Sequence, residues 1–148
     1  MNVSQKCQYA IRAVLELAKC KGKGPTAIGE IASRQAIPPR FLEIILNELK
    51  QAGFVESRRG VQGGYLLVGG PGDISVGQII KFVDGPLDPV KCIAEKGTPC
   101  PLKVGCSLIE LWKRAKDAVE NVYDSCSFQD LMDREQEMSY SKAMDFAI

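Results

Sequence analysis

Residues 38–68 read PPRFLEIILNELKQAGFVESRRGVQGGYLLV, and this stretch decides the fold. Pro38 and Pro39 stand where a helix can begin, because the first helical position needs no backbone N–H donor. Five apolar residues then recur at helical spacing: Phe41, Leu42, Ile45, Leu46 and Leu49. They predict the buried stripe of an amphipathic helix. Gly53 follows Ala52 and is a typical residue for the end of such a helix.

The rest of this stretch predicts a β-hairpin. Two short β-rich runs, 54–58 and 65–68, flank a turn that contains Gly60, Gly63 and Gly64. Such runs, separated by a glycine-containing turn, are typical of two antiparallel strands. The glycines are expected to serve the backbone geometry of the turn.

Two further helices are predicted upstream. Residues 4–21 show helical apolar spacing with Ser4 as the N-cap, and Thr26 is expected to cap a short helix that runs to about residue 35. Three helices followed by a two-stranded hairpin is the order of a winged helix-turn-helix. We therefore expect a mainly α fold with a small hairpin wing, and we assign residues 1–70 to a DNA-binding domain.

In such a domain the third helix enters the major groove and the wing touches the DNA backbone or the minor groove. The third helix offers polar side chains off its apolar stripe: Arg40, Glu43, Asn47 and Lys50. The wing offers a second set for phosphate or minor-groove contacts: Ser57, Arg58, Arg59 and Gln62. The plainer interpretation of the helix set is a solvated surface.

The charge distribution agrees with a polyanionic partner for the front half of the chain. Residues 1–67 contain ten Lys/Arg and five Asp/Glu, whereas residues 68–148 contain nine and thirteen. A basic domain attracts nucleic acid and an acidic one does not. The excess is modest, so it supports double-stranded DNA as the partner without establishing it.

The second half is predicted to hold four segments. Residues 71–91 form a linker and a connecting helix, and residues 92–106 form a cysteine loop. Apolar residues at three- and four-residue steps then predict one long amphipathic helix over 107–132. The apolar stripe of this helix could pack on the core of the same chain, but the small domain of residues 1–70 has little surface left to cover the stripe. We therefore expect a dimerisation helix in a homodimer, followed by a polar, poorly ordered tail over 133–148.

The cysteine loop, CIAEKGTPCPLKVGC, holds Cys92, Cys100 and Cys106. Its glycines and prolines break up regular structure, so the three thiolates can converge on a soft metal centre. Zinc normally takes four Cys/His ligands, often with paired CxxC motifs, and the chain has neither such a motif nor any histidine. These residues favour an iron–sulfur cluster over structural zinc or a bare thiol sensor.

Other function classes find little support. The sequence has no histidine base, no GxSxG motif and no phosphate-binding loop with its Lys-Ser/Thr, so we expect no enzyme. It has no apolar run long enough for a bilayer and no secretory signal, so we expect a cytoplasmic protein without a membrane partner. Six cysteines in that compartment point to metal or redox chemistry rather than disulfides.

The chain resembles the Rrf2 family of bacterial winged-helix transcription regulators. The matching segments are SQKCQYAIRAVLELA, RFLEIILNELKQAGFVESRRG, GGYLL, ISVGQII and CPLKVGC, which together span most of residues 2–131. The resemblance implies a homodimer with crossed long helices on a partly palindromic operator. In cluster-bearing members three loop cysteines hold a 2Fe–2S or 4Fe–4S centre, and by position these are Cys92, Cys100 and Cys106. A glutamate that matches Glu43 helps those members to select between operator classes.

One departure concerns the fourth ligand. Some cluster-bearing members use a histidine three residues after the last cysteine, where this chain has Ile109. Others use an N-terminal acidic residue of the partner subunit, which aligns with Gln8; the neighbouring Cys7 is the candidate here, and Glu110 is a weaker one. The alternative for Cys7 is a buried apolar thiol. The alternative for the whole chain is a cluster-free regulator of the kind that controls cysteine metabolism.

Overall fold

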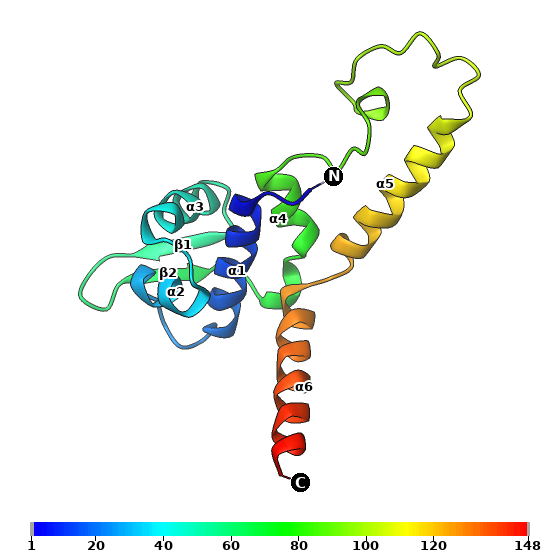
Figure 1. Cartoon of the computed structure of the whole chain (residues 1–148). Coiled ribbons are helices and arrows are strands. Elements are labelled where there is room, and N and C mark those ends of the chain that lie inside the picture. Colours follow the sequence, from blue (N-terminus) through cyan, green and yellow to red (C-terminus); the bar gives the residue numbers. More distant parts are fainter. Residues whose placement is uncertain (1, 148) are drawn as a thin grey trace.

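The computed structural model describes residues 2–147 and confirms a mainly α fold with a small hairpin (Figure 1). In chain order the elements are α1 (Gln5–Lys19), α2 (Ile28–Gln35), α3 (Pro39–Gln51), β1 (Val55–Arg58), β2 (Gly64–Leu67), the 3-10 turn η1 (Pro71–Asp73), α4 (Val76–Val83), the 3-10 turn η2 (Lys91–Ile93), α5 (Leu108–Asp124) and α6 (Phe128–Phe146). Among the described residues, no helix combines the length and the apolar character needed to cross a membrane.

Helix α1 forms the centre of the core, with α3 and α4 packed against it (Figure 1). Its start is confirmed at Ser4, whose side-chain oxygen accepts a hydrogen bond from the backbone N–H of Cys7 at 3.1 Å. The side chains that fill this core are almost wholly buried: Ala10, Val14, Leu17, Leu42, Ile45, Leu46, Leu49, Ile79 and Ile80. The predicted stripe of α3 is therefore confirmed for its four aliphatic members.

The wing is an antiparallel pair in which Val55 lies opposite Leu67 and Arg58 lies opposite Gly64. Its base is tied to the start of α2, because Thr26 and Tyr65 exchange two backbone hydrogen bonds of 2.9 Å. The expected capping role of Thr26 is therefore wrong: Ala27 is the N-cap of α2, and Thr26 is buried in this pairing. A Cβ atom at Gly64 would overlap the Thr26 carbonyl, so glycine permits the close approach.

The single helix predicted over 107–132 is two helices, α5 and α6. The break is fixed by Ser127, which accepts a hydrogen bond from the backbone N–H of Asp130 (3.1 Å) and donates its own N–H to that carboxylate (2.8 Å). Phe128 then inserts into the core and is fully buried. The expectation of a poorly ordered tail is also wrong, because α6 continues to Phe146.

The break is held against the start of α4 by backbone pairing. The N–H of Val76 donates to the carbonyl of Cys126 at 2.8 Å, and the N–H of Phe128 donates to the carbonyl of Ile74 at 3.1 Å. We call residues 74–81 and 124–128 together the α4–α5 junction. From this junction α5 runs toward the cysteine loop, while α6 leaves in the opposite direction (Figure 1).

Candidate nucleic-acid interface and cysteine loop

The outward surface of α3 is the candidate DNA-recognition surface. The structure places Arg40, Glu43, Asn47 and Lys50 on this surface, and all four are exposed. Phe41 was expected in the buried stripe, yet it is 46% exposed and lies edge-on to the Tyr9 ring at 5.9 Å between centroids. Because four aliphatic side chains anchor the opposite face of α3, the helix presents its polar groups on a rigid support.

The wing carries the second set of candidate contacts at the far end of the DNA-binding domain from the cysteine loop (Figure 1). Arg58, Arg59 and Gln62 are exposed, while Ser57 is half-buried beside the second strand. The Arg58 guanidinium lies 3.7 Å from the Glu56 carboxylate. Such an exposed pair is weak, so Arg58 remains free to contact a phosphate.

A buried carboxylate braces the helix-turn-helix, and sequence reasoning missed it. Glu16 on α1 is 5% exposed and accepts hydrogen bonds from Arg34 (3.1 Å) and Gln35 (2.8 Å) of α2. Burial acts to raise the pKa of Glu16, but these two hydrogen bonds and the nearby Lys19 prevail and hold it below its usual value. The signal was available, because Glu16 is a charged residue inside the apolar stripe of α1.

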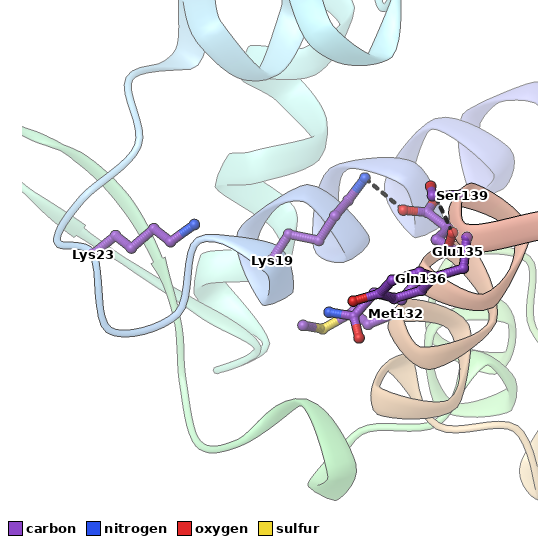
Figure 2. A pocket seen from close by; sticks show the side chains of 7 residues that line it. Lys19, Lys23, Met132, Glu135, Gln136 and Ser139 are labelled. Atoms are coloured by element: carbon purple, nitrogen blue, oxygen red, sulfur yellow. Dashed lines mark hydrogen bonds and ion pairs between the residues drawn. The ribbon is translucent and has the colours of Figure 1, made fainter. Parts of the chain in front are cut away.

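Lys19 connects the buried Glu16 to α6 through ion pairs. Lys19 lies 2.9 Å from the carboxylate of Glu135 on α6 as well as 3.6 Å from Glu16. This pair closes one side of a shallow hollow between the end of α1 and α6, which is also lined by Lys23 and Met132 (Figure 2). The ion pair therefore helps to fix α6 against the DNA-binding domain, away from α3.

The cysteine loop lies beyond the free end of α5 and extends away from the DNA-binding domain (Figure 1). Cys92, Cys100 and Cys106 are each half-exposed and free. Within residues 2–147, no three Cys, Asp or Glu side chains come close enough together to hold a metal ion. The donor chemistry thus suits a soft metal centre, whereas the loop conformation does not gather the three thiols into a ligand set.

Cys7 lies in the core beneath the end of α4. Its side chain is fully buried, and burial together with the charge and hydrogen bonding of Asp84 raises the pKa of its thiol to about 12. Asp84 also accepts a hydrogen bond from the backbone N–H of Ser4 at 2.8 Å. Metal ligation needs the thiolate, so these surroundings favour the buried-thiol alternative, and the ligand role of Cys7 stays a prediction. Glu110 is exposed in the first turn of α5.

Helix α5 has no buried residue among those that the structure describes. Large apolar side chains along it are exposed, including Leu108, Leu111 and Val122. Two ion pairs attach it to the rest of the chain: Lys116 to Asp88 at 2.6 Å, and Lys81 to Asp124 at 2.7 Å. A helix with this much uncovered apolar surface is typical of a protein interface.

Comparison with known proteins gives one consistent set of relatives. Residues 3–134 match the family model described as "Rrf2: Iron-dependent Transcriptional regulator". The chain is 39% identical over 140 residues to the HTH-type transcriptional regulator CymR of Bacillus subtilis, covering 93% of this chain and 96% of that protein. It is 34% identical over 150 residues to the regulator IscR of Aliivibrio salmonicida, covering 100% and 88%. The solved structure of CymR (YrzC), described as the global cysteine regulator of B. subtilis, superposes with a TM-score of 0.73 at 37% identity, covering 88% of this chain and 95% of that one.

Proposed function

Because the chain belongs to the Rrf2 family of transcriptional regulators, we propose that it binds operator DNA as a homodimer and that its three loop cysteines hold an iron–sulfur cluster. The observation that carries the proposal is the placement of three half-exposed thiols on one loop, at the opposite end of α5 from the DNA-binding domain. A cluster bound there would make the loop sensitive to oxidants, nitric oxide or iron supply.

The DNA-binding part of the proposal rests on α3 and the wing. Arg40 and Asn47 can donate to guanine and adenine edges in the major groove, and Glu43 can accept from a cytosine amino group. Arg58 and Arg59 would follow the phosphates beside the groove. Two copies related by a two-fold axis would read a partly palindromic operator, since each copy reads one half-site.

The homodimer is supported by the exposed apolar surface of α5. Leu111 is half-exposed in the single chain, and a second α5 would cover it. Replacing Leu111 by Asp places a charge in that interface, so we expect sedimentation velocity to show monomers in place of dimers. Val61→Asp is the matched control, because Val61 is exposed in the wing turn. Equal dissociation by both variants, or by neither, would contradict dimerisation through α5.

The cluster is tested by purifying the full chain without oxygen and measuring its absorbance spectrum, iron and acid-labile sulfide. We expect a coloured protein whose iron and sulfide disappear when Cys92, Cys100 and Cys106 are replaced by Ala. Cys20→Ala is the control, because Cys20 is a half-exposed cysteine outside the loop. Colourless protein that binds one zinc per chain would contradict the cluster.

A second candidate is a cluster-free regulator of the CymR kind, which would sense through a partner protein. Two observations favour it: the 39% identity to CymR, and the absence of a gathered ligand set in the part of the chain that the structure describes. The two candidates separate in cells. If repression and its response to iron or oxidants both survive the triple cysteine substitution, the cluster-free regulator is supported. If that response is lost, the cluster is supported.

A further inference from the structure

The DNA-facing surface of α3 contains an apolar residue that the polar candidates do not explain. Ile44 is 56% exposed, whereas Leu42, Ile45, Leu46 and Leu49 of the same helix are at most 2% exposed. Isoleucine gains little from such a position. It loses rotamer freedom in a helix, and its burial energy is not realised in the free protein.

Helical spacing puts Ile44 at the edge of the polar surface, with the half-exposed Phe41 on its other side. Arg40 lies four residues before it and Asn47 lies three residues after it, so all three share one side of α3. Arg40 and Asn47 are exposed like Ile44. The apolar side chain is therefore flanked, one turn away in each direction, by side chains that can hydrogen-bond to base edges.

We propose that Ile44 is a specificity-determining residue that packs against the C5-methyl group of a thymine in each half-site. The inference rests on the proposed operator binding. Thymine is the one base that presents a methyl group in the major groove, and an exposed aliphatic side chain there has that group as its apolar partner. Ile44 thus selects a T·A pair at the position it faces. This selection depends on the thymine methyl group and not on hydrogen bonds to the base edges.

The proposal also gives the spacing of the contacts. Four residues of α-helix advance about 6 Å, so Ile44 and Arg40 reach neighbouring positions of the groove. The thymine read by Ile44 therefore lies in the same half-site as the base contacted by Arg40, within a few base pairs of it. This relation can be checked in any operator that the protein selects.

The test uses the full-length protein and duplexes that the wild-type protein selects from a random pool. In the selected duplex, the thymine opposite Ile44 is replaced in both half-sites by deoxyuridine, which lacks only the methyl group. Loss of one buried methyl contact corresponds to about fourfold in affinity, so we expect about 15-fold weaker binding over two half-sites. Ile44→Ala should bind the thymine duplex correspondingly more weakly and should respond to deoxyuridine by less than about twofold.

The matched control is Met138→Ala, because Met138 is 57% exposed on α6 and lies away from α3. It should keep the wild-type response to deoxyuridine. The Ile44→Ala variant is expected to fold, since alanine is the better helix former at an exposed site. An equal response of wild type and Ile44→Ala to deoxyuridine at every thymine would overturn the inference while leaving the proposed function intact. Failure of the wild-type protein to select any sequence would overturn both.

Discussion

Gly77 is predicted to be required for the close packing of α4 against the end of α5. It is buried on α4, and a Cβ atom there would overlap the Asp124 carboxylate and lie 3.0 Å from the Asp124 backbone nitrogen. Rotation of the carboxylate away from this Cβ would disturb its 2.7 Å ion pair with Lys81. The backbone nitrogen can move only if the last turn of α5 moves with it. Gly77→Ala therefore forces a shift between α4 and α5.

The expected destabilisation follows from these two contributions. The exposed ion pair contributes about 0.2–1 kcal/mol, and added volume in a packed contact costs about 1–3 kcal/mol. For a chain of this length each kcal/mol lowers the melting temperature by about 2–4 °C. We therefore expect Gly77→Ala to melt about 2–16 °C below the wild-type protein.

The assay is thermal unfolding followed by circular dichroism at one fixed protein concentration, because the stability of a protein that associates depends on its concentration. Gly29→Ala is the matched control: Gly29 also lies in a helix, but nothing lies within 4 Å of its added Cβ. Alanine there should raise stability by about 0.5–1 kcal/mol, so the two substitutions should have opposite signs. Adding Asp124→Ala to Gly77→Ala removes the carboxylate, so it should recover only the part of the lost stability that comes from the overlap with that carboxylate. A Gly77→Ala protein that melts at or above the wild-type temperature would refute the close contact.

Three further predictions follow from single contacts. Hydrogen bonds lower the pKa of the buried Glu16, so its stabilisation is present above pH 4.5, the ordinary value, and is lost as pH falls through the lowered value. Glu16→Gln should therefore reduce the free energy of unfolding at pH 7 by about 1–3 kcal/mol. The melting temperature of the variant should also fall less than that of the wild-type protein as the pH is lowered below 4.5. Arg59→Ala should weaken operator binding for all sequences and lower the salt slope by about two for a dimer, measured by titration at several salt concentrations, whereas Lys142→Ala on α6 should not. Cys7→Ala should keep its iron in elemental analysis, since the Cys7 side chain is fully buried in the core; loss of iron would restore Cys7 as a ligand.

The DNA-binding domain was predictable because its local signals and its packing agree. The apolar period of α3 gave both its buried side and, by exclusion, the exposed positions of Arg40, Glu43, Asn47 and Lys50. Thr26 was misassigned because its backbone pairs with Tyr65, which lies far along the chain, and local capping rules do not include such a partner.

The two C-terminal helices were merged into one for a different reason. Apolar spacing continues through Cys126, Phe128 and Leu131, so periodicity alone carries across the break. The signal that could have found the break is the capping box formed by Ser127 and Asp130. Ile44 was not among the predicted DNA contacts, because only polar side chains were considered for them. The spacing of the three loop cysteines does not predict how their thiols are arranged in space. A flexible loop without a bound metal has no fixed ligand geometry.

The position of α5 determines how a movement of the cysteine loop can be transmitted to the DNA-recognition surface of α3. Its 17 residues span about 25 Å, so the cysteine loop and the α4–α5 junction lie at opposite ends of one rigid element. Asp88, just before the loop, holds Lys116 on α5, and Asp124 at the other end holds Lys81 on α4. A rearrangement of the loop that moves Asp88 can therefore act on α5 through Lys116, and on the core through the neighbouring Leu87, which is 6% exposed. Val119 and Tyr123 of α5 also pack against the core, so the orientation of α5 depends on these side chains together with the two ion pairs.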